Sequence, residues 1–159
     1  MTSTDTGTDT GAAPGHVFSV TAAWDPAEKA GDLEAQGSGF ASGFAGAPSL
    51  GGRADLTNPE EFVLSALLAC FVQTWSIFLA KLKLAVDRPV VDGTVRLEAD
   101  PAGGYRLAGF RLVPHVPADL WRDRRSEVEK TFALAEKYCI VSKVLRGEGR
   151  TISVEAKPV

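Results

Sequence analysis

The uncharged run at residues 62–80, FVLSALLACFVQTWSIFLA, constrains the fold more than any other part of the chain. It follows a helix start in which Asn58 can act as the N-cap, Pro59 suits the first helical position and Glu61 completes a capping box. We therefore expect one long central helix that begins at Pro59 and ends near Leu84.

The same run is long enough to cross a membrane. Against a membrane stand the polar residues inside the run, which are Ser65, Gln73, Thr74 and Ser76, and the amphipathic strands elsewhere, which need a soluble core. A helix that is apolar on nearly every side must then be covered by protein all round. One chain of this size covers one side with its sheet, so the run predicts an intertwined homodimer with no membrane partner.

Period-2 alternation of apolar residues predicts strands at residues 17–24 and 90–99. The second of these leads through turn residues into a further strand at residues 105–113, which predicts a hairpin. Residues 31–52 are glycine-rich and leave open whether they form two short strands and a loop. A last strand is expected at residues 152–156.

Helical spacing returns at residues 119–137. The core-facing stripe of this predicted helix consists of Val128, Phe132, Ala135 and Cys139. Strands, a long helix, a hairpin, a second helix and a final strand together predict an α+β domain with helices packed on an antiparallel sheet.

A chain of 159 residues that is 45% hydrophobic can bury one core, so we expect a single domain over residues 16–159. Residues 1–15 are rich in Thr, Gly, Asp and Ala and are expected to be a disordered tail. The 17 Lys and Arg against 20 Asp and Glu give a net charge of −3, which favours small molecules or proteins over nucleic acid as partners.

The chain has two cysteines and no secretion signal, which favours the reducing cytoplasm and argues against a structural disulfide framework. Cys70, Cys139, His16 and His115 form none of the paired spacings of a zinc site, so no metal is expected. The two thiols are then either inert or reactive.

Two segments resemble the signature segments of the OsmC/Ohr family of organic hydroperoxide resistance proteins. The first is TNPEEFVLSALLACF at residues 57–71, in which Cys70 stands ten residues after Glu60 (70 minus 60). The second is EKYCIVSKVL at residues 136–145, in which Val-Ser follows two positions after Cys139. The resemblance covers most of the chain from about Val17 and implies the OsmC-like fold.

The resemblance also implies a thiol peroxidase that reduces organic hydroperoxides in oxidative stress defence. Cys70 would be the attacking thiolate and Cys139 the resolving thiol. No bound cofactor is implied, because an external dithiol, either a lipoyl group or a small thiol, would reduce the resulting disulfide. A thiol among apolar neighbours needs a nearby cation to stay ionised, and in the family an arginine and a glutamate flank the reactive cysteine.

The family's glutamate carries over to Glu60, and the only arginine between Phe18 and the helix start is Arg53, so these two are the candidate partners of Cys70. The helix rise separates Glu60 from Cys70 by about 15 Å, so a shared cluster would need Glu60 of a partner subunit. One departure is visible, because the family commonly has Pro directly after its second cysteine and this chain has Ile140.

Two other functions remain open at this point. Free cysteines are often merely buried, so the chain is alternatively a non-catalytic OsmC-like protein that binds a small molecule in an apolar pocket. A cysteine hydrolase is a weaker alternative, since neither His16 nor His115 lies in a motif that would orient it as a base.

Overall fold

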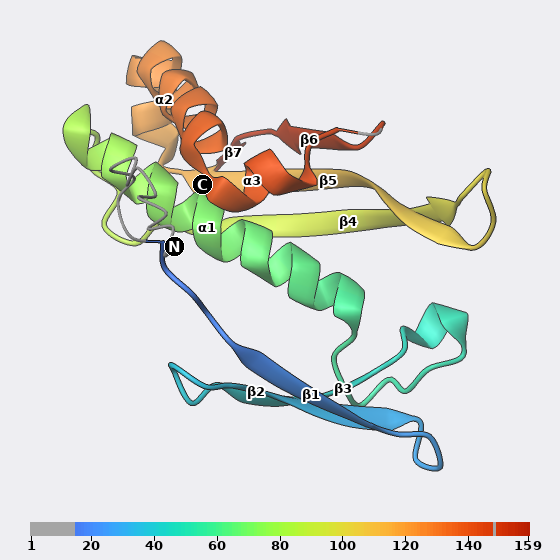
Figure 1. The fold of residues 1–159 in the computed structure, drawn as a ribbon. Helices are drawn as coiled ribbons and strands as arrows, with labels where there is room; N and C mark the ends of the chain where they lie inside the picture. Colours follow the sequence, from blue (N-terminus) through green and yellow to red (C-terminus); the bar gives the residue numbers. More distant parts are fainter. Residues whose placement is uncertain (1–14, 148) are drawn as a thin grey trace, which may run out of the picture.

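The computed structural model describes residues 15–147 and 149–159, so the tail predicted at residues 1–15 lies almost wholly outside the described residues. Strands and helices are mixed along the chain, which confirms the α+β class (Figure 1). The elements, in chain order, are β1 (Val20–Asp25), β2 (Ala30–Ala35), β3 (Ala41–Ala45), a short 3-10 helix η1 (Pro48–Leu50), α1 (Pro59–Lys81), β4 (Val91–Ala99), β5 (Tyr105–Val116), α2 (Ala118–Tyr138), α3 (Ile140–Leu145), β6 (Thr151–Val154) and β7 (Lys157–Pro158).

The strands form two sheets rather than one. Strands β1, β2 and β3 form an antiparallel meander, and β4, β5 and β6 form the second sheet, with β7 also paired to β5. The β4–β5 pair is antiparallel as predicted, but both β6 and β7 run parallel to β5, so the prediction of an antiparallel sheet is wrong for these two pairs. The cause is the crossover through α2 and α3, which returns the chain to the start of β5 rather than to its end.

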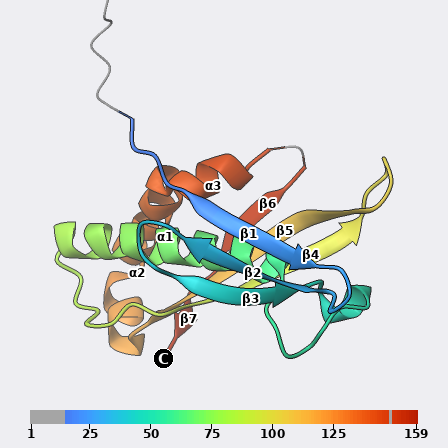
Figure 2. The ribbon, with the colours of Figure 1, turned by 60° about the horizontal axis from the view of Figure 1, so that its bottom comes forward.

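The first sheet lies below α1 in Figure 1, with the second sheet and α2 above that helix. It is tied to the start of α1 by the backbone, because the N–H of Ala45 donates to the carbonyl of Thr57 at 2.9 Å. Every residue of β1 is exposed, Val20 and Trp24 included. The alternation at residues 17–24 predicted a strand with one buried face, but among the described residues neither face of β1 is buried, and the strand lies on the outside of the first sheet (Figure 2).

Helix α1 buries a single i, i+4 stripe, which consists of Leu67, Phe71, Trp75 and Leu79. The other sides are half-buried or exposed, and Ile77 keeps 53% of its surface accessible. Of the described part of the chain, α1 is the one helix with the length and composition of a membrane span. The described residues therefore leave much of this apolar helix uncovered.

The predicted start of α1 is confirmed. The Asn58 side-chain oxygen accepts from the backbone N–H of Glu61 at 2.9 Å, and Pro59 is the first helical residue. In a capping box the Glu61 side chain would accept from the backbone N–H of Asn58. Here the Glu61 carboxylate instead accepts from the Thr57 hydroxyl at 2.7 Å.

The end of α1 comes earlier than Leu84. The N–H of Leu84 donates to the carbonyl of Leu79, and the N–H of Lys83 donates to that of Ala80. These two bonds define a Schellman motif, in which Lys83 occupies the left-handed position with φ 54°. The helix thus ends at Lys81, and a lysine occupies the left-handed position where glycine is the usual residue.

Helix α2 buries the predicted stripe, since Val128, Phe132, Ala135 and Cys139 are at most 7% exposed. It packs on α1 through a buried hydrogen bond from the Trp75 indole N–H to the Thr131 hydroxyl at 2.9 Å. This contact fixes the C-terminal end of α2, and with it Cys139, against α1.

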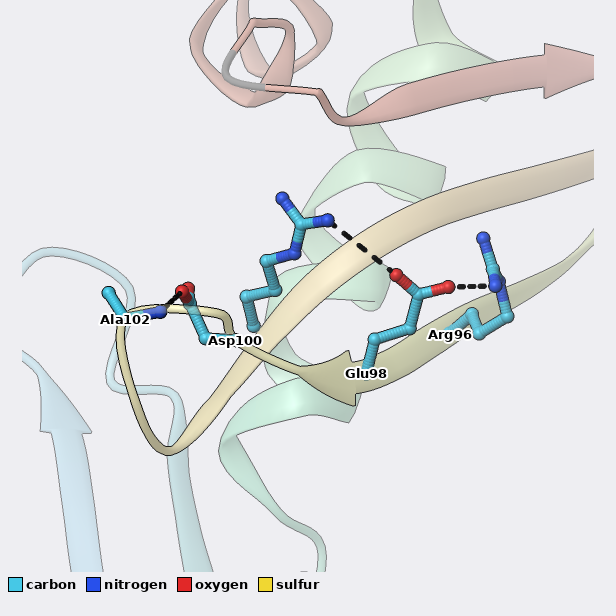
Figure 3. A network of polar contacts seen from close by, with 5 residues as sticks. Arg96, Glu98, Asp100 and Ala102 are labelled. Carbon is cyan, nitrogen blue, oxygen red and sulfur yellow. Dashed lines mark hydrogen bonds and ion pairs between the residues drawn. The ribbon is translucent and has the colours of Figure 1, made fainter.

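The hairpin predicted from residues 90–113 is confirmed, and side chains near its turn reinforce it (Figure 3). Glu98 forms ion pairs with Arg96 and, at 3.8 Å, with Arg106 on the opposite strand. Asp100 accepts from the N–H of Ala102 at 2.8 Å within the turn. This network holds the exposed face of the β4–β5 pair, away from the helices that carry the cysteines.

Candidate active site

Cys70 and Cys139 are brought together by the packing of α1 against the junction of α2 and α3. Cys139 is completely buried, whereas Cys70 keeps part of its surface accessible. The two thiols are free, and the hydrogen bond between them shifts the pKa of each. A partly accessible thiol is therefore paired with a protected one.

The pKa of Cys70 lies below its usual range. Burial alone would raise that pKa, because it disfavours the thiolate. Hydrogen bonds outweigh burial, and the donors are the Cys139 thiol, the backbone N–H groups of Val141 and Ile140 and the Thr74 hydroxyl. All of these donors are neutral, so dipoles rather than a cation favour the Cys70 thiolate.

The Thr74 hydroxyl is shared between two acceptors. It lies four residues after Cys70 on the same side of α1 and donates to the Cys70 carbonyl at 2.8 Å. Its help to the thiolate is the weakest among the four donors. The i, i+4 spacing was a signal for Thr74, whereas nothing in the sequence marked the two backbone donors.

Cys139 shows the opposite shift. Burial raises the pKa of Cys139, and the hydrogen bond that it shares with Cys70 raises it further. Its sulfur also serves as the N-cap of α3, accepting from the backbone N–H of Ser142 at 3.4 Å. Cys139 is thus held protonated, in a fixed position, beside a neighbour that ionises more readily.

Glu60 does not join the two cysteines within one chain. It lies in the first turn of the continuous helix α1, so about 15 Å of helix separates it from Cys70. Its Oε2 atom is buried and has no hydrogen-bond partner among the described residues. A buried carboxylate oxygen without a partner is costly, so Glu60 stands out among the described residues.

Arg53 is also occupied elsewhere. Its guanidinium forms a two-bond pair with the Asp55 carboxylate, at 3.0 and 2.6 Å, and both side chains are exposed. This pairing lowers the pKa of Asp55 and raises that of Arg53. Arg53 is not among the groups that hold the Cys70 thiolate in the single chain, and its role stays a prediction.

Residues 52–155 match the family model described as OsmC-like protein. The chain belongs to the OsmC-like protein family. A curated relative from Staphylococcus epidermidis, named organic hydroperoxide resistance protein-like 2, is 30% identical to this OsmC-like chain over 91 residues. The matched region makes up 57% of this chain and 61% of the relative.

Solved structures show the same OsmC-like fold. The organic hydroperoxide resistance protein OsmC from Legionella pneumophila gives a TM-score of 0.73 at 23% identity, covering 91% of this chain and 100% of that chain. An organic hydroperoxide resistance protein from Elizabethkingia anophelis gives 0.75 at 18% identity, covering 92% and 99%. At these identities the likeness establishes the fold.

Ile140 directly follows Cys139 in this OsmC-like chain. Ile140 is the first residue of α3, and its side chain is 71% exposed. The side chain therefore contributes little packing, while the backbone N–H of the same residue is one of the groups that lower the pKa of Cys70.

Proposed function

We propose that this protein is a thiol peroxidase that reduces organic hydroperoxides to alcohols. One observation carries the proposal, namely the contact between a partly accessible Cys70 of lowered pKa and a buried Cys139 of raised pKa. This asymmetry assigns the attacking thiolate to Cys70 and the resolving thiol to Cys139. The names of the relatives, which refer to organic hydroperoxide resistance, agree with this chemistry.

The proposed cycle has three steps. The Cys70 thiolate attacks the terminal oxygen of the hydroperoxide, so that an S–O bond forms, the O–O bond breaks and the alkoxide leaves as alcohol after taking a proton from solvent. The Cys139 sulfur then attacks the sulfenic sulfur, and the oxygen leaves as water with the thiol's proton. An external dithiol reduces the disulfide by exchange and is itself oxidised to a disulfide.

The hydrogen bond between the two thiols implies that they lie near each other, which would favour rapid condensation. Condensation with Cys139 competes with further oxidation of the sulfenic acid, and a neighbour already in contact needs little movement of the backbone. We place the reaction in the cytoplasm, where lipoyl groups and small thiols are both candidate reductants.

We further propose that the active unit is a homodimer. Three features support this proposal, because the described residues leave them without a cover: the exposed strand β1, the exposed sides of α1 and the unpartnered Oε2 of Glu60. A second copy about a two-fold axis would supply it and would bring Glu60 of one subunit toward Cys70 of the other. The apolar sides of α1 would then be buried in protein rather than in lipid.

The decisive test is peroxide turnover by the wild type beside Cys70→Ser and Cys139→Ser, with cumene hydroperoxide as substrate and a dithiol as reductant. We expect Cys70→Ser to lose all activity. Cys139→Ser should complete one turnover and then stall unless a strong reductant is present. Mass spectrometry should find a Cys70–Cys139 disulfide in the oxidised wild type, and a wild type that consumes no peroxide and forms no disulfide would instead indicate a binding protein.

A further inference from the structure

The hydroxyl group of Ser142 is buried and unsatisfied. Ser142 lies in α3, and none of its surface is accessible. Its Oγ atom has no hydrogen-bond partner among the described residues. The hydroxyl of Ser76 in α1, by contrast, donates to the carbonyl of Val72 at 2.9 Å. A buried hydroxyl without a partner lowers stability, so packing alone does not account for a serine at position 142.

The Cys139 sulfur lies within reach of this hydroxyl. The backbone N–H of Ser142 already donates to that sulfur at 3.4 Å. A short covalent path through Cα and Cβ joins the same nitrogen to the hydroxyl oxygen, and rotation about the Cα–Cβ bond moves the hydroxyl without moving the helix. Burial raises the pKa of Cys139, and the nearby Ser142 hydroxyl acts in the opposite direction although it forms no complete hydrogen bond in the reduced protein.

Cys139 has to carry negative charge when the proposed disulfide is reduced. A dithiol reaches Cys70 first, because Cys70 is partly accessible and Cys139 is completely buried. A thiolate of the dithiol attacks the Cys70 sulfur, so that a new S–S bond forms to the reductant, the Cys70–Cys139 bond breaks and its electron pair leaves on the Cys139 sulfur. The second thiol of the dithiol then displaces Cys70 and closes the reductant's own disulfide, and the proton that this thiol loses balances the one that Cys139 gains.

A buried thiolate is a poor leaving group unless hydrogen bonds receive its charge. We propose that Ser142 assists the reduction of the Cys70–Cys139 disulfide by donating a hydrogen bond from its hydroxyl to the departing Cys139 sulfur. The hydroxyl has no other partner among the described residues, so it is available when the charge develops. The donor acts little on the disulfide itself, because the sulfur is neutral there. This role deepens the proposed peroxidase function and rests on it for the biological use of the disulfide.

Ser142→Ala separates this chemical role from a structural one. The substitution removes a buried oxygen that has no partner, so we expect the protein to resist urea at least as well as the wild type. Ser76→Ala is the matched control, because it also removes a serine hydroxyl but one that is bonded to a carbonyl. Ser142→Thr keeps the hydroxyl and should keep most of the rate of reduction.

The experiment starts from full-length protein that diamide, rather than a peroxide, has oxidised to the disulfide. Dithiothreitol then reduces the protein at a fixed pH, and mass spectrometry of quenched samples follows the loss of the Cys70–Cys139 disulfide. We expect the second-order rate constant of Ser142→Ala to be about three- to tenfold lower than those of the wild type and Ser76→Ala. Alkylation of Cys70 by iodoacetamide in the reduced proteins should stay within about twofold of the wild type.

Equal rates of reduction in Ser142→Ala and the wild type would overturn the proposal, and so would an equal slowing in Ser76→Ala. A parallel loss of stability and of Cys70 alkylation in Ser142→Ala would assign Ser142 a structural role and would also reject it. If diamide forms no disulfide, there is no departing sulfur and the proposal fails. Slower reduction of Ser142→Ala in a protein that consumes no peroxide would uphold the donor and reject the peroxidase, so the two failures are distinguishable.

Discussion

Cys70 and Cys139 share one hydrogen bond, yet their pKa values shift in opposite directions. A hydrogen bond between two thiols stabilises whichever sulfur is the acceptor as a thiolate and keeps the donor protonated. Ionising the more buried Cys139 costs more free energy, so Cys139 stays protonated and donates the hydrogen bond to Cys70. Position within the core, rather than any difference between the side chains, thus decides which thiol ionises more readily.

Removing the Cys139 thiol should therefore weaken the Cys70 thiolate. We expect Cys139→Ala to raise the pKa of Cys70, because a donor to the thiolate is lost while burial remains. Below that pKa the thiolate fraction falls, so alkylation of Cys70 near neutral pH should slow. Cys139→Ser keeps a donor and should lie between Cys139→Ala and the wild type in a pH series of alkylation rates. A slower rate in Cys139→Ser than in Cys139→Ala would contradict this assignment.

At the scale of elements, the position of the cysteine pair depends on how α2 is fixed to α1. The bond from Trp75 to Thr131 is buried, and the Thr131 hydroxyl also donates to the carbonyl of Val128 at 2.6 Å. Thr131 is fully buried, so water cannot reach the Trp75 indole N–H in place of the Thr131 hydroxyl. This polar contact orients two otherwise apolar surfaces.

Thr131→Val tests that contact with a side chain of nearly the same shape. It leaves the Trp75 N–H buried without an acceptor, and we expect the free energy of unfolding to fall by about 1–3 kcal/mol. Thr131→Ser keeps the hydroxyl and should lose less. Urea unfolding of the three proteins provides the measurement, and a Thr131→Val variant as stable as the wild type would show that the hydrogen bond contributes nothing net.

The left-handed residue that ends α1 predicts a stabilising substitution. Lys83 adopts φ 54°, a conformation that costs less for glycine than for any residue with a Cβ atom. We expect Lys83→Gly to raise the free energy of unfolding by about 0.5–1 kcal/mol. Lys83→Ala keeps the Cβ atom and should give no gain, so an equal gain in both variants would point to the lost charge instead.

For α1, the sequence predicts the start of the helix correctly but not its end. Asn58 and Pro59 are side-chain signals for a helix start, and they placed it correctly. The helix end depends on a backbone conformation that lysine rarely adopts, so residues 82–84 were assigned to the helix. Local signals in a sequence report local geometry, and Lys83 carried none.

Longer-range features were less accessible from sequence. The stripe of α2 was predicted correctly because its spacing is visible within one helix. The parallel pairing of β6 with β5 was not, because it depends on the path of the chain through α2 and α3. The same holds for the site, where the sequence indicated Cys70 and Cys139 but not the backbone donors that come with their packing.

At the scale of the whole molecule, the proposed dimer makes each site depend on two chains. Cys70 of one subunit would meet Glu60 of the other, since about 15 Å of helix separates the two residues within a subunit. The apolar surface left on α1 and β1 supports this arrangement. It predicts that defects in the two residues can complement each other.

Mixing Glu60→Ala subunits with Cys70→Ser subunits tests this directly. Each homodimer should be inactive or nearly so, because both of its sites carry the same defect. In the mixed dimer one site receives both defects, and the other keeps an intact Cys70 and an intact Glu60. We expect peroxide turnover to reappear after unfolding and refolding the two variants together. No recovery from a verified mixed dimer would reject the shared site.

The N-cap of α3 gives the reduced protein a built-in reporter. The sulfur of Cys139 closes the first turn of α3 by accepting from the N–H of Ser142. A disulfide bond to Cys70 would draw that sulfur closer to α1 and would weaken the cap, so we expect this short helix to open more often in the oxidised protein. Amide hydrogen exchange at Ser142 should then be faster after peroxide treatment, while the N–H of Cys139, which donates to Ala135, should stay protected. The rate of amide exchange in the first turn of α3 would thus report whether Cys70 and Cys139 are reduced or oxidised.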